Sequence, residues 1–234
     1  MRVDLIILSH AKNTELRALT QQTVNSCLQS DAAIDFKVLI MEQQPEVVYE
    51  GAQTHFIDEA FNYNRFMNIA IGMTDSPYVC LCNNDLIFGT GWCTTLLHTM
   101  RHYKLLSACP RCPDATRIKQ GVSFGYNNSQ QMSGWCIMTD RKLYDIIGKI
   151  DEDFPFWFAD NAYAEQLKIH KVAHALVAAS VVKHLGSSTL NTLEAAMQHE
   201  YTRAYVRKFY TKYPKNESAV YFKKQADAQV RPSE

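Results

Sequence analysis

Short apolar runs alternate with longer amphipathic stretches along the first hundred residues. The apolar runs predict buried strands at residues 3–8, 36–41 and 78–82, and a further short strand is expected at residues 54–57. The stretches between them predict helices at residues 15–30, 64–73 and 92–103. The first helix is expected to be capped by Thr14 and to share one apolar side made of Leu16, Leu19, Val24 and Leu28. Strands that alternate with helices in this way predict an α/β sheet with helices on both faces.

The second half of the chain has a less regular pattern. Residues 107–130 predict a loop with short strands, and apolar runs return at residues 132–139 and 173–182. Short helices are expected at residues 141–147, ended by Gly148, and at 161–170. Because no repeat or Gly/Ser-rich linker interrupts the chain, we expect one α/β domain over residues 1–190. A helical extension over residues 191–234 is expected to follow it.

The composition is that of an ordinary globular protein. Hydrophobic residues make up 47% and charged residues 21% of the 234 positions, which excludes a disordered chain. The 24 Lys and Arg balance the 24 Asp and Glu, which excludes a uniformly basic nucleic-acid binder. The charges are nevertheless segregated. Residues 31–59 hold seven carboxylates and one lysine, whereas residues 201–224 hold seven Lys or Arg and one acid.

Seven cysteines, with no cleavage site before the first apolar run, predict free thiols in a reducing cytoplasm. Cys109 and Cys112 form a single CxxC pair, whereas a structural zinc site needs two further ligands. We therefore interpret them as two buried or loop thiols, with zinc as the alternative. The longest apolar run, residues 175–182, is far shorter than the roughly 20 residues of a transmembrane helix. We expect no transmembrane segment and a soluble or at most peripheral protein.

Polar segments directly follow three of the predicted strands. They are residues 9–13, Glu42 and residues 83–85. Ligands of open α/β sheets bind beyond the carboxyl ends of strands, so we expect a site there. The Gly-rich dinucleotide fingerprint is missing after the first strand, which disfavours a nicotinamide or flavin enzyme. In an extended segment Asn83 and Asp85 share one face, where a carboxylate could hold a divalent cation; a simple turn is the alternative.

Further motifs surround Asp85 in a definite order. They are residues 61–71 (FNYNRFMNIAI), 91–92 (GW), 134–136 (GWC), 150–154 (IDEDF), 158–160 (FAD) and 184–188 (HLGSS). This ordered set resembles the GT-A glycosyltransferases, particularly the family-2-like members, over roughly residues 3–190. The resemblance implies a GT-A-like, Rossmann-type mixed sheet flanked by helices, which binds a nucleotide sugar. Two positions depart from the family pattern, because Asn83 replaces the first acid of the DxD motif and Ala159 replaces one acid before the acceptor helix.

The resemblance also implies catalytic roles. Asp85 and His184 would hold Mn²⁺ or Mg²⁺ against the charge that grows on the β-phosphate, although His184 could instead bond to backbone at its strand end. Asp160 would be the base that takes the proton of the acceptor hydroxyl, with Asp151 and Asp153 as fallbacks. The alternative for Asp160 is a helix N-cap. By family analogy, one base and a single displacement imply inversion at the anomeric carbon.

Donor recognition is expected at the first loop, at the end of the second strand and on the helix after the third. The candidates are Ser9, His10, Asn13, Glu42, Arg65, Asn68, Asn83 and Asn84. A solvated helix charge is the alternative for Arg65. Gly134 and Trp135 would contact the acceptor, with a core tryptophan as the alternative. The donor is expected to be a UDP-sugar because such donors are frequent in the family.

The C-terminal extension interleaves basic and aromatic side chains. Its basic residues are Arg203, Arg207, Lys208, Lys212, Lys215, Lys223 and Lys224. Its aromatic residues are Tyr201, Tyr205, Phe209, Tyr210, Tyr213, Tyr221 and Phe222. The i, i+4 stripe of Tyr201, Tyr205 and Phe209 predicts core contacts, while nucleic acid or an anionic membrane surface is the functional alternative. A second basic stretch, over residues 101–119, is expected near the acceptor and would favour an anionic one.

The sequence therefore predicts a metal-dependent, inverting glycosyltransferase. Its acceptor is expected to be a hydroxymethylated pyrimidine flipped out of DNA, in a viral enzyme that acts in the host cytoplasm. Synthesis of lipopolysaccharide or capsule on a glycan or lipid-linked acceptor is the alternative within this class. A noncatalytic binder of nucleotide sugars or nucleic acid, and a nucleotidyltransferase, are the alternatives outside it. The sequence leaves the oligomeric state open.

Overall fold

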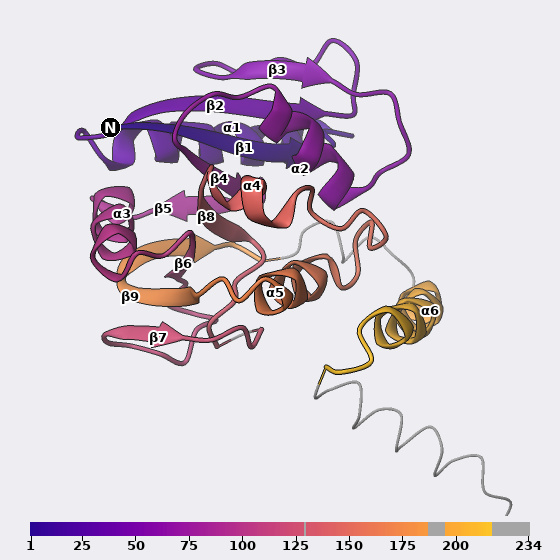
Figure 1. The fold of residues 1–234 in the computed structure, drawn as a ribbon. Coiled ribbons are helices and arrows are strands. Elements are labelled where there is room, and N and C mark those ends of the chain that lie inside the picture. The colour runs from indigo at the N-terminus through magenta and orange to yellow at the C-terminus, as the bar shows by residue number, and fades with distance from the viewer. Residues whose placement is uncertain (129, 187–194, 217–234) are drawn as a thin grey trace, which may run out of the picture.

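One mixed sheet forms the centre of the protein. The computed structural model describes residues 1–128, 130–186 and 195–216, without the side chains of residues 195–203. In these residues nine strands form the sheet (Figure 1). Eight of them follow the order β3-β2-β1-β4-β8-β6-β9-β5, and the ninth, β7, pairs with β9. The strands are β1 Arg2–Ser9, β2 Asp35–Glu42, β3 Gln53–Phe56, β4 Tyr78–Cys82, β5 Leu86–Phe88, β6 Ser107–Arg111, β7 Val122–Phe124, β8 Cys136–Asp140 and β9 His174–His184.

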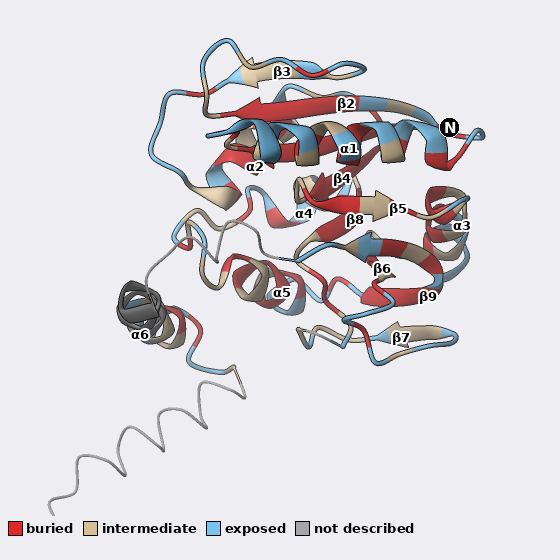
Figure 2. Ribbon diagram, turned by 180° about the vertical axis from the view of Figure 1, so that it is seen from behind, coloured by how far each residue is buried: buried red, intermediate tan, exposed pale blue. Residues whose placement is uncertain are grey.

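Helices cover both faces of the sheet. They are α1 Thr14–Ser30, α2 Tyr63–Gly72, α3 Trp92–Tyr103, α4 Leu143–Ile147, α5 Ala159–Ile169 and α6 Ala195–Lys212. Helices α1 and α3 pack against one apolar face, and α2, α4 and α5 against the other. The central strands are therefore buried on both sides (Figure 2), which explains why their sequences are continuous apolar runs. The α/β fold predicted from the sequence, with helices on both faces, is confirmed.

The direction of the strands decides which loops meet. Strands β1, β2, β3 and β4 run parallel, so their carboxyl ends share one edge. Strand β8 is antiparallel to β4, with Cys136 opposite Cys82, so the residues just before β8 reach the same edge. The end of β9 joins them because His184 pairs with Leu86 of β5. Segments far apart in the sequence therefore converge beyond the end of β4.

Two details of α1 differ from the sequence-based expectation. Asn13, not Thr14, is the N-cap, and its side chain accepts the N–H of Leu16. The buried face contains Thr20 and Thr23, whereas Leu28 is 40% exposed. Both threonine hydroxyls hydrogen-bond to the segment after β4, so polar contacts place Thr20 and Thr23 on the face that also buries Val24 and Cys27.

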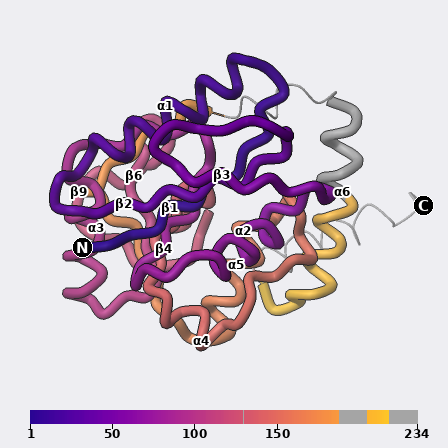
Figure 3. The backbone as a smooth tube through the Cα atoms, turned by 90° about the horizontal axis from the view of Figure 1, so that it is seen from above, coloured from indigo at the N-terminus to yellow at the C-terminus, as the bar shows by residue number. Residues whose placement is uncertain are grey.

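Helix α6 packs at the end of the molecule opposite to the first residue (Figure 3). Phe209 and Tyr213 are buried against Phe154 and Ala162, and Tyr205 packs at the edge of this cluster. The predicted core role of the aromatic stripe is confirmed for Tyr205 and Phe209. The proposed domain boundary, residues 187–188 and residues 217–234 lie outside the described residues, as does the side chain of Tyr201. Within the described part of the chain, no helix combines the length and the apolar character that crossing a bilayer requires.

Candidate active site

Asn83, Asp85 and His184 converge beyond the end of β4. The Nε2 atom of His184 lies 3.1 Å from Oδ1 of Asp85 and 3.4 Å from Nδ2 of Asn83. Asn84 points the other way and donates from Nδ2 to Oγ1 of Thr20 at 3.0 Å. The expectation that Asn83 and Asp85 share a face is therefore confirmed. Asn84 instead holds the segment against α1.

The backbone fixes this convergence. The N–H of Asn83 donates to the carbonyl of Trp135 at 2.9 Å, and the N–H of Leu185 donates to the carbonyl of Asp85 at 2.9 Å. These bonds continue the β4–β8 and β5–β9 pairings beyond the strands. The side chains at the edge are therefore held by the sheet rather than by a free loop, which favours a preorganised site.

The surroundings of Asp85 fit a divalent cation. Its carboxylate is 4% exposed, and Oδ1 accepts no hydrogen bond from the described residues, although His184 approaches it at 3.1 Å. A buried carboxylate oxygen without a donor is costly unless a cation or a proton satisfies it. Carboxylate oxygen suits Mg²⁺ and Mn²⁺, and imidazole is a common further ligand. Asp85 and His184 are therefore the residues that could hold such an ion.

A cleft of about 550 Å³ opens beside this pair. Asn83, Trp135 and His184 line one part of it. The other residues that line it include Tyr63, Asn64, Asn128, Gly134, Phe156, Trp157, Phe158, Asp160 and Tyr163. The indole of Trp135 stacks on the imidazole of His184, with ring centroids 5.6 Å apart and an interplanar angle of 12°. A second hollow, of about 570 Å³, runs along α1 and Phe88 away from these residues.

Asp160 lies in the cleft, in the first turn of α5. Burial raises its pKa above the ordinary value of 3.8, although hydrogen bonds from the backbone of Asn161 and the side chain of Asn128 partly offset this effect. The N–H of Asn161 is 2.8 Å from Oδ1. Because the helix begins at Ala159, Asp160 is not its N-cap residue. A carboxylate with a raised pKa in a cleft is well suited to take a proton.

Gly134 makes room for Asp160. A Cβ atom at position 134 would lie 2.7 Å from Cβ and 3.0 Å from Oδ2 of Asp160. The oxygen of Gly134 also accepts the hydroxyl of Tyr63 at 3.3 Å. The segment before β8, which the sequence suggested for acceptor contact, therefore also positions the candidate base.

Asp151 and Asp153 lie outside the cleft and anchor α6. Nζ of Lys212 is 2.8 Å from Oδ1 of Asp151 and 2.5 Å from Oδ2 of Asp153. The hydroxyl of Tyr213 donates to Oδ2 of Asp151 at 2.6 Å. The hydrogen bond from Lys212 lowers the pKa of Asp153, and Lys208 adds to the effect. Of the three carboxylates suggested as base, Asp160 is the one that lines the cleft.

Ser9 and Glu42 are buried beneath the loop that follows β1. Oε1 of Glu42 accepts the N–H of Ala11 at 3.0 Å, and Oε2 accepts the hydroxyl of Tyr49 at 2.7 Å. The hydroxyl of Tyr49 is also 2.9 Å from Oγ of Ser9. Burial, with the adjacent carboxylate, raises the pKa of Tyr49 to about 12. In this arrangement Ser9 and Glu42 shape the loop, together with Tyr49, which the sequence alone did not single out.

His10 of this loop is half-buried, whereas Lys12 and Asn13 are exposed. Its Nε2 lies 2.9 Å from Nε2 of Gln44. Burial and the nearby ammonium of Lys12 lower the pKa of His10, so the neutral ring is favoured. Asn13, the other candidate from this loop, caps α1.

Arg65 and Asn68 bind neighbouring chain segments. The guanidinium of Arg65 lies 2.7 Å from Glu59 and 3.5 Å from Glu152. Asn68 donates from Nδ2 to the carbonyl of Ile150 at 2.8 Å and accepts its N–H at 2.9 Å. Neither is among the described residues that line the cleft. The side chains of α2 thus fix the loop that leads to Asp160.

No basic residue of the second stretch is among the described residues that line the cleft. Arg101 donates to the hydroxyl of Tyr78 at 3.3 Å, at the amino end of β4 and opposite to Asn83. Arg111 donates to the carbonyl of Ala178. On α6, Lys208 and Lys212 pair with Asp153 and Asp151. For Arg101 the expectation that this stretch flanks the site is wrong, because strand direction carries Arg101 to the other edge of the sheet.

All seven cysteines are buried and free, as the sequence predicted. Sγ of Cys109 interacts with the backbone of Ser133, and Sγ of Cys112 accepts the N–H of His184 at 3.4 Å. Both are therefore buried thiols that bond to backbone groups. Within the described residues they are not part of any cluster of metal-ligating groups.

Sheet order, helical layers and the convergence at β4 define a GT-A-like fold. The chain is similar to the crystal structure of GalNAc-T7 with UDP, GalNAc and Mn²⁺, with a TM-score of 0.62 and 10% sequence identity. The match covers 78% of this chain and 43% of that one, so the chain corresponds to less than half of GalNAc-T7. No protein-family model matches the sequence. No curated protein matches it either.

Proposed function

We propose that the chain is a metal-dependent glycosyltransferase that uses a nucleotide sugar, expected to be a UDP-sugar. The observation that carries the proposal is the pair of Asp85 and His184, with an unsatisfied buried oxygen on Asp85, beside the cleft that holds Asp160. The fold supports it, because the similar structure of GalNAc-T7 contains UDP, GalNAc and Mn²⁺. Function depends on the site rather than on the fold, so these residues are the test.

In the proposed reaction Asp160 accepts the proton of an acceptor hydroxyl. The oxygen attacks the anomeric carbon of the donor, the bond from that carbon to the diphosphate breaks, and a nucleoside diphosphate leaves. Asp85 and His184 would hold Mn²⁺ or Mg²⁺, whose charge stabilises the leaving diphosphate. One base and one displacement give inversion at the anomeric carbon. Asp151 and Asp153 have no part in these steps, because they bind α6.

The lining of the cleft supports an acceptor with a flat, partly apolar ring. The aromatic side chains that line the cleft are those of Tyr63, Trp135, Phe156, Trp157, Phe158 and Tyr163. Aromatic faces bind sugar rings and also stack on nucleobases. Because Lys208 and Lys212 are paired with carboxylates, a neutral glycan hydroxyl is the acceptor we favour. A hydroxymethylated pyrimidine in DNA is the second candidate, since a flipped base would present the same flat surface.

The test is product analysis with labelled UDP-sugars and Mn²⁺, using glycan acceptors in one arm and hydroxymethyl-pyrimidine DNA in the other. We expect release of UDP and a labelled acceptor. Asp160→Asn should lower turnover by about 10²–10⁴-fold, the usual value of a general base. Asp153→Asn, outside the cleft, is the matched control and should retain activity.

The remaining outcomes separate the alternatives. Release of pyrophosphate would indicate a nucleotidyltransferase, and binding without turnover would indicate a noncatalytic binder. A steep loss of acceptor affinity with salt would favour DNA over a glycan. Equal turnover in wild type and Asp160→Asn would remove the assigned base.

A further inference from the structure

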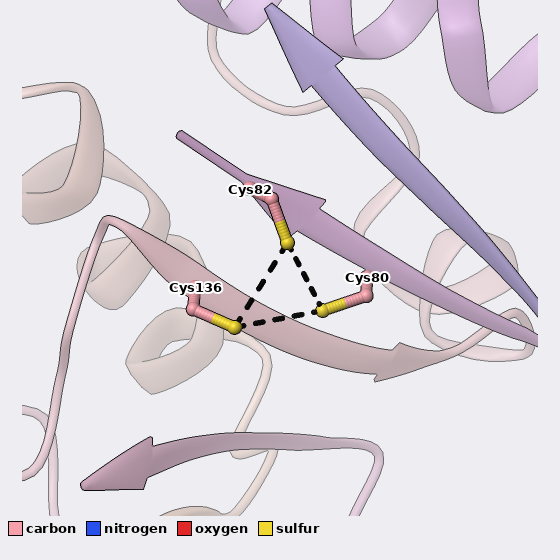
Figure 4. A group of neighbouring side chains, drawn as sticks. All are labelled: Cys80, Cys82 and Cys136. Carbon is pink, nitrogen blue, oxygen red and sulfur yellow. Dashed lines mark hydrogen bonds between the residues drawn. The ribbon is translucent and has the colours of Figure 1, made fainter. Parts of the chain in front are cut away.

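Three thiols lie close together in the core, and two of them are adjacent in sequence to residues of the candidate active site. Cys80 and Cys82 lie on β4, and Cys136 begins β8 (Figure 4). Residues two apart on a strand share a face, and Cys136 is opposite Cys82 in the antiparallel register. The sulfur atoms of Cys80 and Cys82 are 3.4 Å apart, and that of Cys136 is 3.7 Å from the first and 3.9 Å from the second. All three side chains are fully buried.

We propose that this triad binds one thiophilic cation, Cu⁺ or Zn²⁺, through its three sulfur atoms. A zinc ion about 2.3 Å from each sulfur of a tetrahedral site places those sulfurs about 3.8 Å apart. The triad already has this spacing, so binding requires no movement of the strands. Soft thiolate ligands select Cu⁺ and Zn²⁺ over the hard cations that suit Asp85. The two sites therefore differ in the metal they accept.

The chemistry of the thiols agrees with this geometry. A thiolate is the form that binds metal, so the thiol protons leave as the ion takes their place. Cys27 of α1 belongs to the same core cluster and interacts electrostatically with Cys136. Its sulfur is not within ligand distance of all three thiols, so within the described residues the triad offers three protein ligands, which suits three-coordinate Cu⁺; tetrahedral Zn²⁺ would need a fourth ligand from outside the protein.

The position of the triad suggests what a bound ion would do. Cys82 directly precedes Asn83, and Cys136 directly follows Trp135. An ion shared by β4 and β8 would clamp the two strand ends from which the cleft is built. Its role is therefore structural, and the site does not depend on the proposed glycosyl transfer.

The test uses the full chain, reduced and stripped of metal by a chelator. Zn²⁺, Cu⁺ buffered by a competing chelator, and Co²⁺ as a spectroscopic substitute are added in separate titrations. We expect one Zn²⁺ or Cu⁺ per chain by native mass spectrometry, and a thiolate-to-metal charge-transfer band with Co²⁺. Cys80→Ala, Cys82→Ala and Cys136→Ala should each weaken binding by about 100-fold or more, since one of three ligands is lost.

Two control variants test whether metal binding is specific to the three thiols of the triad. Cys109→Ala removes a buried thiol on the other face of the sheet, and Asp85→Asn alters the candidate active site; both should bind as wild type does. Circular dichroism checks that the alanine variants fold. If a variant does not fold, the charge-transfer band of the wild-type protein still reports whether sulfur binds the metal. The absence of that band in wild type, or its persistence in a folded Cys136→Ala protein, would overturn the proposal. Because neither readout measures sugar transfer, its outcome is independent of the proposed function.

Discussion

Asp160 can occupy the cleft because position 134 carries no side chain. A Cβ at position 134 would clash with Cβ of Asp160 rather than with the mobile end of a long side chain. Rotation of the Asp160 side chain therefore cannot relieve the clash. The backbone at one of the two positions must move, and the carboxylate moves with it. A catalytic group displaced by even about 1 Å loses much of its effect.

We therefore expect Gly134→Ala to lower sugar transfer by at least about 10-fold, because it displaces Asp160 from reach of the acceptor. The crowding should also cost about 1–3 kcal/mol of unfolding free energy. Turnover and urea unfolding measure the two effects. Gly72→Ala, at the end of α2 with no atom within 4 Å of the added Cβ, is the control and should be close to neutral. Full activity in Gly134→Ala would contradict the assigned positions.

The raised pKa of Asp160 predicts the pH dependence of the reaction. The base acts only without its proton, so kcat/KM should fall as pH decreases through a pKa above the ordinary 3.8. The residual activity of Asp160→Asn should lack this acid limb. If kcat/KM of the variant still falls in the same way at low pH, a group other than Asp160 is responsible for the decrease.

The same shift predicts the sign of a stability effect. The folded state holds the proton of Asp160 more tightly than the unfolded chain does, so its stability decreases as pH rises from the unfolded pKa through the folded one. At neutral pH the buried carboxylate is therefore destabilising. Asp160→Asn should be at least as stable as wild type in urea unfolding at pH 7, and a marked loss of stability would contradict this account.

At the scale of elements, α6 is attached by aromatic packing rather than by its ion pairs. The ring of Phe209 is 1% exposed and lies 5.1 Å from Phe158, which lines the cleft, and 5.6 Å from Phe154. The Lys212 side chain is 39% exposed, so water screens its bonds to Asp151 and Asp153. Packing onto Phe158 connects α6 to the wall of the cleft.

Phe209→Ala should therefore cost about 3–5 kcal/mol of local stability, the usual range for a buried phenylalanine. Lys212→Ala is the comparison and should cost less than about 1 kcal/mol. Hydrogen exchange would show fast exchange of α6 in Phe209→Ala while β1 and β4 stay protected. Similar exchange in the two variants would mean that the ion pairs carry the attachment.

The elements that sequence predicted well are those in which one force dominates. Strands β1, β2 and β4 are buried on both faces, so continuous apolar runs predicted them closely. Strand β5 was missed because three residues are too few to show a period, and its pairing with β9 is decided by distant sequence. The buried face of α1 was predicted correctly at Val24 but wrongly at Leu28, and it includes Thr20 and Thr23, which hydrogen-bond to a residue about sixty positions away.

At the scale of the whole molecule, the order of motifs predicted which segments meet but not which side chains reach the cleft. Asp85, Asn83, His184, Trp135 and Asp160 do meet. Asp151 could not be separated from Asp160 by sequence, because the partner that binds it, Lys212, comes from α6. The triad of Cys80, Cys82 and Cys136 was likewise invisible, since its last member joins through sheet register alone.

The central claim is that Asp85 holds a divalent cation that makes the cleft bind a nucleoside diphosphate. Calorimetric titration of UDP into wild type and Asp85→Asn, each with and without Mn²⁺, tests it most directly. Asp85→Asn keeps the size and shape of the side chain, and circular dichroism checks its fold, because the contact of Oδ1 with Nε2 of His184 at 3.1 Å changes. We predict that UDP binds wild type only when Mn²⁺ is present and that Asp85→Asn abolishes this dependence together with the binding. Equal, Mn²⁺-dependent affinity in the two proteins would contradict the account.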